Sequence, residues 1–503
     1  MKYIIGIDIG TTATKAIAYD LNGKQILETS KAYPLIQNVS GQAEEDPKII
    51  FDAVQETIFQ ISKKLGPEAL AISWSSQMHS LIGLDDEGNL LTNSITWADN
   101  RADSEVELAK ESGQAKAIYQ KTGMPMHPMA PVYKLKWLKN TNLDLYKKVD
   151  KWIGIKDYII YRLTGKIMED IPMAAGSGLL DLQTLNWDDQ LLDWLELSKH
   201  NLPTLAKATE VVGTINEDYL QKLSLSENTK IVLGSSDGYL STIGVGVLNN
   251  QEFALNVGTS GAIRTLESRP MIDEKARFFC YPAEKDYYLI GGPVNNGGII
   301  FDWAKKTLFS ADETAEDFLD IAQTVPAGSG GLIFHPYLGG ERSPIWDANA
   351  KGSFVGLTRN HTKPHLARSV IEGIIFNLYE AMSAIRTCVA KPKAMRITGG
   401  FVKSDFVRQI LANVFNLPII AMRNDQSGSL AAMFLARLGL GLDNELSDIK
   451  KFINEDKVYF PNLKEVEIYQ KIIPIYHEIG LELSKSYFEL ANFQNNYPNL
   501  FSE

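Results

Sequence analysis

The chain has 503 residues, of which 45% are hydrophobic and 22% charged, a composition typical of a globular enzyme with two or more domains. Its formal net charge of -11 argues against non-specific binding to nucleic acid or to an anionic membrane. The two cysteines, Cys280 and Cys388, form no CxxC motif, so we expect neither a zinc cluster nor a dithiol site.

Targeting signals are also not expected. Asp8 interrupts the first apolar run too early for a signal peptide. No window approaches the run of about 18 apolar residues that suggests a membrane span. We therefore expect a cytoplasmic protein with no membrane partner.

The first part of the chain alternates between strand and helix patterns. These follow in the order strand Tyr3–Ile9, strand Thr14–Tyr19, strand Gln25–Thr29, helix Pro47–Lys64 and strand Leu70–Trp74. Asn22-Gly23 between the second and third strands is a strong β-hairpin signal. A hairpin followed by alternating helix and strand predicts a mixed α/β layer domain.

A second start of the same kind occurs near Phe253. The segment Asn256-Val257-Gly258-Thr259-Ser260 repeats the pattern of Asp8-Ile9-Gly10-Thr11-Thr12, and each segment lies between two strand patterns. We infer a duplicated architecture with a first domain over residues 1–246 and a second over 247–440, joined by a linker at Leu248–Gln251. Residues 441–503 are expected to form a helical tail that is packed on the second domain, with the pattern of Glu465–Leu490 broken at Pro474.

The turn after the first strand carries phosphate-binding chemistry. Gly10 lets the backbone approach an anion closely, and the amides and hydroxyls up to Lys15, including Thr11 and Thr12, can surround phosphate oxygens. Asp8 would repel a phosphate, so we expect it to act through Mg²⁺ or through bound water. The alternative is a plain hairpin turn that happens to be rich in Gly and Thr.

The repeat of this turn favours a nucleotide site. Two phosphate turns, one in each domain, are what an actin-like ATP clamp requires, and Gly399-Gly400 follows a third strand pattern in the right order for an adenosine contact. The predicted fold is therefore α/β, with two actin-like (ribonuclease H-like) domains and a catalytic cleft between them. No P-loop motif and no complete GxGxxG motif occurs.

Asp237 comes directly after the apolar strand pattern Lys230–Leu233. Phosphoryl transfer needs one group to accept the proton of the attacking hydroxyl, and a carboxylate at a strand end suits that role. The alternative is a turn-forming Asp-Gly pair.

A polyol site is predicted from two further segments. Their amide, imidazole, carboxylate, guanidinium and indole groups can hold and stack on a sugar, and the candidate residues are Gln77, Met78, His79, Trp97, Asp99 and Arg101. The alternative for each is a surface loop. His361 and His365 have metal-pair spacing, but Pro364 disfavours the helix that would align them, so we expect no metal there.

Together these residues resemble the FGGY family of carbohydrate kinases. Gly352–Leu357 with the continuation to Glu372 is similar to the family's C-terminal signature, and Pro131–Leu138 is similar to its N-terminal signature. Gly340–Asp347 is also similar to a family segment. The resemblance spans nearly the whole chain.

The resemblance implies roles for particular residues. It implies that Asp8 and Thr12 lie near the transferring phosphate, that Asp237 is the catalytic base, and that Thr259 contacts phosphate. Gly298, Gly400 and Ser404 match nucleotide contacts, although Ser404 replaces the Asn of glycerol kinases. The implied cofactors are ATP and Mg²⁺.

The predicted substrate is a sugar or sugar acid. Gln77-Met78-His79 with Trp97–Arg101 is most similar to gluconate kinases, which predicts conversion of D-gluconate to 6-phospho-D-gluconate, while xylulose kinases share the Gln-Met-His core. Arg101 is expected to meet the gluconate carboxylate, or else to pair with Asp99 or Asp103. An actin-like chaperone or filament ATPase is the alternative from another class, and the sequence leaves a homodimer open.

Overall fold

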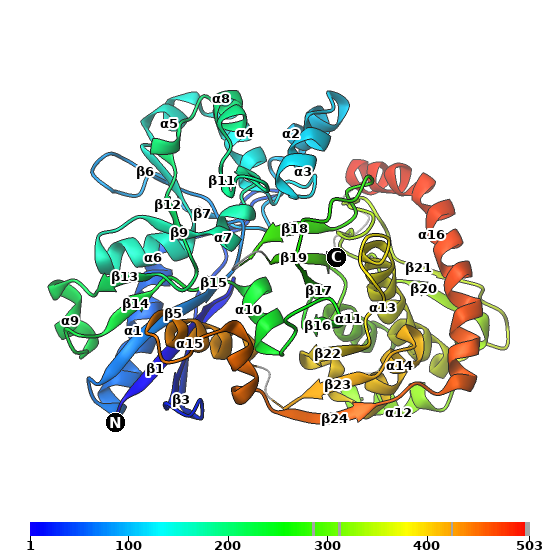
Figure 1. Cartoon of the computed structure of the whole chain (residues 1–503). Helices are drawn as coiled ribbons and strands as arrows, with labels where there is room; N and C mark the ends of the chain where they lie inside the picture. The colour runs from blue at the N-terminus through cyan, green and yellow to red at the C-terminus, as the bar shows by residue number, and fades with distance from the viewer. Residues whose placement is uncertain (284–286, 310–312, 424–425, 498–503) are drawn as a thin grey trace. The chain divides into compact units, whose positions relative to one another are not determined.

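The computed structural model describes residues 1–283, 287–309, 313–423 and 426–497, so residues 498–503 of the predicted tail lie outside it. The chain forms two compact units. The first comprises Met1–Leu248, Leu266–Leu289 and Gln426–Ile453, and the second comprises Asn249–Thr265, Ile290–Asp425 and Asn454–Glu503. Figure 1 shows the ribbon coloured by residue number, with the helices and strands labelled.

The first unit contains a seven-stranded mixed sheet of order β13-β14-β5-β1-β2-β3, with β15 paired to β5. The strands of this sheet are β1 (Tyr3–Ile9), β2 (Ala13–Tyr19), β3 (Gln25–Ala32), β5 (Ala69–Ser76), β13 (Val211–Thr214), β14 (Lys230–Val232) and β15 (Ser235–Ser236). The unit's helices are α1 (Pro47–Leu65), α2 (Asp103–Glu111), α3 (Gln114–Thr122), α4 (Pro131–Thr141), α5 (Leu143–Lys148), α6 (Ile155–Thr164), α7 (Ile171–Ala175), α8 (Asp189–Leu195), α9 (Glu217–Leu223), α10 (Asp237–Gly244) and α15 (Ser427–Gly439). Shorter strands complete it: β4 (Glu44–Glu45), β6 (Ile82–Leu84), β7 (Ser94–Ile95), β8 (Lys151–Ile153), β9 (Met168–Asp170), β10 (Leu180–Asp181), β11 (Asn186–Trp187), β12 (Thr204–Ala206) and β18 (Phe279–Pro282).

Both faces of this sheet are buried, which explains why β1 carries apolar residues on both faces before Asp8. Alternate side chains of a strand point to opposite faces. Ile5 and Ile7 pack in the core that includes α1 and α6, whereas Ile4 packs in the core that includes α15. In Figure 1 helices accordingly lie on both sides of the strands. The predicted β-hairpin, helix and strand of the first 76 residues are confirmed, with bounds that differ by a few residues.

The second seven-stranded sheet has the order β18-β19-β17-β16-β22-β23-β24. Its remaining strands are β16 (Glu252–Val257), β17 (Gly261–Glu267), β19 (Tyr288–Val294), β22 (Ala394–Thr398), β23 (Ile419–Met422) and β24 (Glu455–Tyr459). The second unit also contains β20 (Ile333–His335), β21 (Ser353–Val355) and the helices α11 (Gly298–Leu308), α12 (Ala315–Gln323), α13 (Lys363–Ile385), α14 (Asp405–Phe415) and α16 (Leu463–Asn496). Two antiparallel strands joined by a glycine turn, β16 and β17, thus occur in this sheet too, as the repeat in the sequence predicted.

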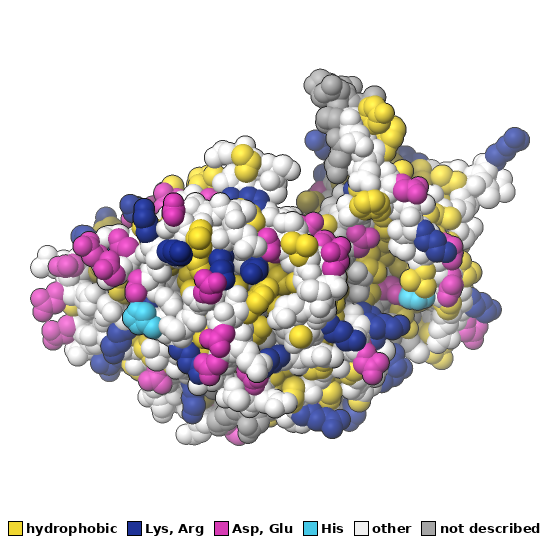
Figure 2. Space-filling view, turned by 90° about the horizontal axis from the view of Figure 1, so that it is seen from above, with side chains coloured by type: hydrophobic (Ala, Val, Ile, Leu, Met, Phe, Trp, Pro, Cys, Tyr) yellow, Lys and Arg dark blue, Asp and Glu magenta, His cyan; other side chains and the backbone are white. Residues whose placement is uncertain are grey.

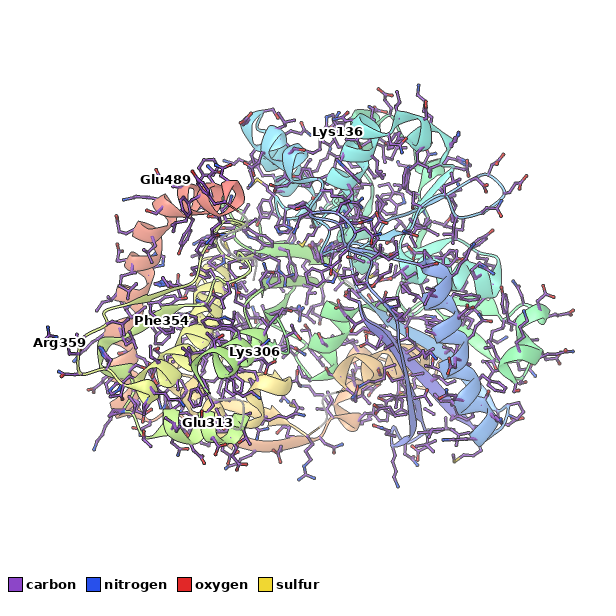
Figure 3. The ribbon with its side chains drawn as sticks, turned by 180° about the vertical axis from the view of Figure 1, so that it is seen from behind. Lys136, Lys306, Glu313, Phe354, Arg359 and Glu489 are labelled. Atoms are coloured by element: carbon purple, nitrogen blue, oxygen red, sulfur yellow. The ribbon has the colours of Figure 1, made fainter. Side chains whose placement is uncertain are left out.

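Helix α13 forms the centre of the second unit. Its Glu372 accepts hydrogen bonds from Arg368 Nε (2.7 Å) and from the hydroxyl of Tyr469 on α16 (2.8 Å), and all three side chains are buried. Phe354 of β21, labelled in Figure 3, lies with its ring 4.5 Å from that of Phe334 on β20, a strand that also packs against α13. The C-terminal signature therefore connects α13 to the tail helix α16.

The predicted break at Pro474 is wrong, because α16 is one helix from Leu463 to Asn496. A proline inside a helix removes one backbone hydrogen bond and costs about 3 kcal/mol or more. Here buried Tyr469 and Tyr476 flank the proline, and the His335 Nε2–H donates to the carbonyl of Tyr476 (3.0 Å). This packing outweighs the local cost of Pro474.

The predicted domain boundaries at residues 246 and 440 stay predictions. The two compact units are not two continuous blocks of sequence, because Leu266–Leu289 and Gln426–Ile453 belong to the first unit. Helix α15 packs on the first sheet, where Leu430 and Met433 contact the side chains of Ile4 and Ile17. A Cβ on Gly6 would lie 2.1 Å from the carbonyl oxygen of Ser429, so only glycine permits this approach.

The surface seen in Figure 2 carries Lys and Arg side chains interspersed with Asp and Glu. Among the described residues, no helix combines the length and the apolar character that crossing a membrane requires.

Candidate active site

Three parallel strands of the first unit end at one edge of its sheet. β1 pairs in parallel with β5, where Ile9 lies opposite Ser76, and β15 pairs in parallel with β5, where Ser236 also lies opposite Ser76. The next residues along these three strands are Gly10, Gln77 and Asp237. The carboxyl ends of parallel strands therefore bring the first phosphate turn, part of the predicted sugar site and the predicted base to one edge.

Asp8 lies on β1 next to this edge. The hydroxyl of Ser75 on β5 donates to its Oδ1 (2.6 Å). Burial raises the pKa of Asp8 to about 6, the Ser75 hydrogen bond opposes the rise, and the charge of Asp237 adds to it. Lys15 lies opposite Asp8 on β2 and forms an ion pair with Glu28 (3.5 Å). Asp8 and Asp237 thus influence one another electrostatically.

Asp237 is the first residue of α10, and its side chain is exposed. Ser236 caps the helix by accepting a hydrogen bond from the Tyr239 amide (3.2 Å), and the Gly238 amide donates to Asp237 Oδ1 (2.6 Å). The predicted strand Lys230–Leu233 ends one residue earlier, at Val232, and the chain bends at Gly234 before β15. At Gly234 φ is 64°, and a Cβ there would lie 2.1 Å from the Trp74 carbonyl oxygen, which explains the glycine.

A buried ion pair that the sequence analysis missed lies behind β15. Lys156 and Asp170 are both fully buried and pair with each other, and Ser235 donates to Asp170 Oδ1 (2.6 Å). Asp170 also accepts from the Met173 amide (3.2 Å) and so caps α7. The ion pair holds the strand that precedes Asp237.

The first turn is tied to the predicted sugar site by side chains. Trp97 Nε1–H donates to Thr11 Oγ1 (2.9 Å), and the Thr11 hydroxyl donates to Gln77 Oε1 (3.0 Å). Gln77 Nε2–H in turn donates to both carboxylate oxygens of Glu45 (3.1 and 2.8 Å). Tyr33 supports the turn by donating to the Gly10 carbonyl (2.5 Å).

Glu45 was not predicted. It is fully buried, and burial raises its pKa to about 8 while its hydrogen bond from Gln77 opposes the rise. The only sequence signal is its place in the acidic run before α1, which has the ordinary appearance of a helix cap. Thr12, by contrast, is exposed, as a residue that meets a phosphate requires.

His79 is held in an unusual conformation. Its φ is 67°, and its Nδ1–H donates to the Gly176 carbonyl (2.7 Å). The buried ammonium of Lys134 donates to the carbonyls of His79 (2.7 Å), Ile95 (3.2 Å) and Thr96 (2.6 Å). Lys134 therefore joins the His79 loop to the loop before Trp97.

Burial lowers the pKa of Lys134 to about 7, the charge of Asp99 opposes the fall, and the charge of Arg101 adds to it. Its role could have been read from the N-terminal signature, since Lys134 lies among the apolar residues of α4 that face the core. Met78 beside His79 is also buried.

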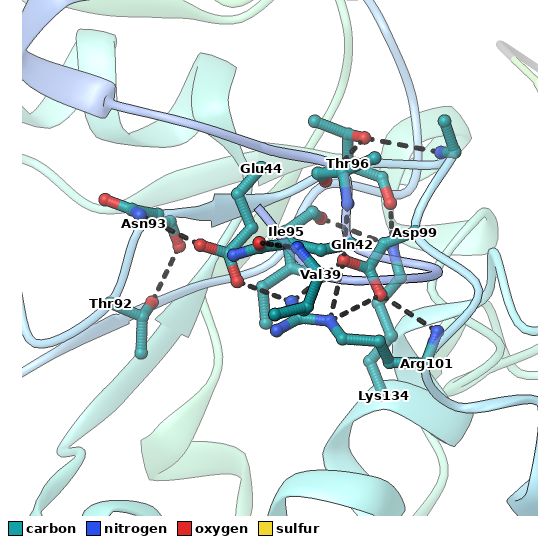
Figure 4. Close-up of polar contacts among 12 residues, drawn as sticks. Val39, Gln42, Glu44, Thr92, Asn93, Ile95, Thr96, Asp99, Arg101 and Lys134 are labelled. Carbon is teal, nitrogen blue, oxygen red and sulfur yellow. Dashed lines mark hydrogen bonds and ion pairs between the residues drawn. The ribbon is translucent and has the colours of Figure 1, made fainter. Parts of the chain in front are cut away.

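Arg101 forms ion pairs with both Asp99 and Glu44 (Figure 4). Arg101 Nε donates to both oxygens of Asp99 (3.1 and 3.0 Å), and its Nη2 donates to Glu44 Oε1 (2.5 Å). The guanidinium lies over the Trp137 ring at 4.6 Å. The sugar contacts of Asp99 and Arg101 stay predictions, and this geometry favours the alternative of an Arg101–Asp99 pair.

The second turn lies in the second unit and is built from backbone. The Gly298 amide donates to the Gly258 carbonyl (2.7 Å), and the Ile299 amide donates to the Thr259 carbonyl (3.1 Å). A Cβ on Gly298 would lie 2.6 Å from the Gly258 oxygen. Gly298 begins α11, so the predicted phosphate turn adjoins a helix N-terminus.

The third turn ends at the same sheet edge as the second. β16 pairs in parallel with β22, with Asn256 opposite Thr398, and Asn256 Nδ2 donates to Thr398 Oγ1 (3.1 Å). Gly399 follows with φ of 109°, and Gly400 is exposed with open space around it. Ser404 caps α14 by accepting from the Phe406 amide (3.2 Å).

A buried carboxylate that the sequence analysis passed over supports the second turn. Glu341 accepts from the Asn295 amide (2.5 Å), Asn296 Nδ2 (2.8 Å) and Asn377 Nδ2 (2.6 Å). Burial raises its pKa, and these hydrogen bonds oppose the rise. It holds the Asn295–Gly297 segment that leads to Gly298.

His361 and His365 do not form a metal pair in the structure. His361 Nδ1 accepts from the Thr358 amide (2.9 Å), so its Nε2–H donates to the Gly330 carbonyl (3.2 Å). Within the described residues, no group of three or more His, Cys, Asp and Glu side chains has the arrangement of a metal site.

Two domain models of the FGGY family of carbohydrate kinases match the chain, the N-terminal domain over residues 3–244 and the C-terminal domain over residues 253–439. The chain is 36% identical over 504 residues to a gluconokinase of Bacillus subtilis strain 168, covering 98% of each chain. A solved gluconate kinase from Lactobacillus acidophilus is 62% identical over 97% of this chain and 99% of its own, with a TM-score of 0.96. A ligand-bound xylulose kinase structure from the same organism has the same identity and TM-score, over 97% of this chain and all of its own.

Proposed function

Since this chain belongs to the FGGY family of carbohydrate kinases, we propose that it transfers the γ-phosphoryl group of ATP to D-gluconate, with Asp237 as the general base. The observation that carries the proposal is the meeting of Asp237, Asp8 and the Gly10–Thr12 turn at one edge of the first sheet. Membership of a kinase family also argues against an actin-like chaperone or filament protein.

In the proposed reaction, Asp237 accepts the proton of the terminal sugar hydroxyl as that oxygen bonds to the γ-phosphorus and the bond to ADP breaks. Its exposed position at the start of α10 suits contact with a substrate, since a general base must reach the proton that it removes. The product is 6-phospho-D-gluconate.

The remaining residues serve to hold the phosphates. We assign the backbone amides of Gly10–Thr12 and the Thr12 hydroxyl to the transferring group. In the second unit, we assign Gly258, Thr259 and the start of α11 at Gly298 to the ATP phosphates, and Gly399 and Gly400 to the adenosine. Ser404 is a weaker assignment because its hydroxyl caps α14.

Asp8 is suited to a magnesium ion held through water. Mg²⁺ in ATP sites is bound by one or two carboxylates together with phosphates and waters, so a site with a single carboxylate fits. Asp8 offers such a carboxylate, and only its Oδ1 takes the bond from Ser75. When bound with ATP, Mg²⁺ would neutralise part of the phosphate charge.

Gluconate is the proposed substrate because relatives with that name are similar over nearly the whole chain. Its carboxylate requires a cation or several donors. His79 is a candidate in its imidazolium form, because its Nδ1–H donates to the Gly176 carbonyl and its Nε2 can donate to a carboxylate only when the ring carries a second proton. Arg101 is a weaker candidate, because Asp99 and Glu44 already meet its charge.

Xylulose is the second candidate, and two observations favour it. A structure named as a xylulose kinase is 62% identical to this chain, and the pairing of Arg101 removes the charge that would distinguish a sugar acid from a neutral ketose.

Release of ADP with D-gluconate, D-xylulose and glycerol tests the proposal. We expect the highest kcat/KM with gluconate and the lowest with glycerol. A higher value with xylulose would replace the substrate and keep the kinase. Arg101→Ala separates the two roles of this residue: a loss confined to gluconate supports the carboxylate contact, and equal losses with both sugars support the ion pair with Asp99.

A further inference from the structure

A chain of hydrogen bonds runs from a predicted sugar-binding side chain to a buried carboxylate. It starts at the Trp97 indole, passes through the Thr11 hydroxyl and the Gln77 amide, and ends at Glu45. Each of its bonds is 3.1 Å or shorter, and each joins side chains that are far apart in the sequence. The chain therefore exists only because the first unit is folded.

The inner half of this chain is closed to solvent. Glu45 is fully buried and Gln77 is 3% exposed, so their hydrogen bonds in the described part of the chain go to other protein groups. An amide buried in this way must find partners for both of its ends. Gln77 finds Thr11 at one end and Glu45 at the other.

The direction of the chain is set at Glu45. Above its pKa Glu45 is a carboxylate, which only accepts hydrogen bonds, and below it the carbonyl oxygen of the neutral group still accepts from the Gln77 NH₂ group, which lies on both Glu45 oxygens. The Gln77 oxygen then faces Thr11. The Thr11 proton is then donated to Gln77, which leaves a Thr11 lone pair for the Trp97 indole N–H. Without Glu45, the amide can turn by 180° and donate to Thr11 instead.

We propose that Glu45 is a positioning residue of the kinase, which sets the direction of the hydrogen bonds that join Trp97 of the predicted sugar site to Thr11 of the predicted phosphate turn. This inference rests on the proposed function for the meaning of the two ends. It assigns phosphate binding at the first turn to backbone amides and to Thr12, since the Thr11 proton is already used.

The proposal also gives a route by which the sugar affects the phosphate turn. Movement of Trp97 against a sugar alters its bond to Thr11, and Thr11 lies in the turn between β1 and β2. A second route exists through the backbone, because β4, which contains Glu45, pairs with β7 just before Trp97. The experiment must separate these two routes.

The indole N–H resonance of Trp97 provides a readout that needs no turnover. In the full chain labelled with ¹⁵N at tryptophan, the resonance is identified by its loss in Trp97→Phe. We expect Glu45→Leu to shift it, and Glu45→Gln, which keeps one acceptor, to shift it less. In a Thr11→Val background, Glu45→Leu should no longer shift it, because the side-chain route is cut.

Thr57→Val is the matched control. Thr57 is buried in α1, and among the described contacts its hydroxyl donates only to the Val54 carbonyl of the same helix (2.9 Å), so it takes no part in the hydrogen bonds from Trp97 to Glu45. This control should leave the Trp97 resonance and the effect of Glu45→Leu unchanged. A shift of equal size with and without the Thr11 hydroxyl would overturn the proposal in favour of the backbone route, and so would no shift at all.

Kinetics supply the second arm, with whichever sugar the wild-type enzyme phosphorylates. Coupled residues show non-additive effects. The loss of kcat/KM in the double variant Glu45→Leu with Thr11→Val should therefore differ by about threefold or more from the product of the two single-variant losses. Additive losses count against the proposal. If Glu45→Leu does not fold, Glu45→Gln takes its place in both arms with the same criteria. Failure of wild-type turnover would refute the proposed function and leave the resonance test standing.

Discussion

The two glycine turns of the molecule share a plan but differ in charge. Asp8 on β1 is bonded to Ser75 on β5, and Asn256 on β16 is bonded to Thr398 on β22, at equivalent places in two parallel strand pairs. The first turn has a carboxylate beside it and the second has a neutral amide. The two strand pairs thus differ in charge because Asp8 of the first stands where the second has Asn256.

The two turns are also held by different means. Thr11 is held by the side chains of Gln77 and Trp97, whereas the second turn is held by backbone amides of Gly298 and Ile299. Carboxylates repel phosphate, while backbone amides at a helix start attract it. The difference is the reason for our proposal that the second turn, at the start of α11, holds ATP phosphates and that the first turn meets the reacting group.

The largest expected effect comes from Asp237, the carboxylate at the sheet edge of the first unit. Asp237→Asn should lower kcat by about 10²-fold or more, because amides do not accept the hydroxyl proton. The KM for the sugar should change much less. Steady-state ADP release checks this, with Asp189→Asn as the control, since Asp189 is also an exposed first residue of a helix. Near-normal turnover would remove Asp237 from the mechanism.

Asn256→Asp makes the second turn resemble the first. The shape is retained, and the Thr398 hydroxyl can donate to the new carboxylate. A negative charge near bound phosphates costs about 1–3 kcal/mol in a partly buried site, so KM for ATP should rise by about 10-fold to 100-fold. The KM for the sugar should stay within about threefold. An unchanged KM for ATP would show that this turn does not hold phosphate.

Gly298→Ala tests the backbone contact of the second turn. The new Cβ would lie 2.6 Å from the Gly258 oxygen, so the turn must shift. We expect KM for ATP to rise by about 10-fold, since about 1.4 kcal/mol is one lost hydrogen bond. Gly339→Ala is the control, because no atom lies within 4 Å of the Cβ position there. Equal behaviour of the two variants would contradict the assignment.

The smallest expected effect is on stability. Since burial raises the pKa of Asp8 to about 6, its contribution to stability is present at low pH and lost as the pH rises through 6. Asp8→Asn removes this loss. Solvent reaches part of the side chain, so we expect a gain of about 1 kcal/mol at pH 7.5, or about 1–2 °C in Tm for a unit of this size, and a smaller gain at pH 4.5. Thermal unfolding at both pH values measures it. A gain that is larger at pH 4.5 would reverse the sign and refute the burial effect.

Several elements were predictable because they depend on neighbours in the sequence. The strands around Asp8 and Asn256, the hairpin at Asn22-Gly23 and helix α1 follow from apolar spacing and turn residues. The helix through Pro474 was not, since its stability comes from Tyr469 and Tyr476 packed against α13 and β20. Local propensity is decisive only where tertiary packing does not oppose it.

By itself, the sequence determined the repeated strand–turn–strand units, the resemblance to the FGGY kinases and the carboxylates at the strand ends, because each is written in contiguous residues. Only the tertiary structure decided how those residues are held. Glu45 meets Gln77, Lys134 meets the His79 and Thr96 carbonyls, and Arg101 meets Glu44 across many residues of chain. The partners of a buried polar group are set by strand pairing and helix packing, and these bring together residues that no local pattern connects.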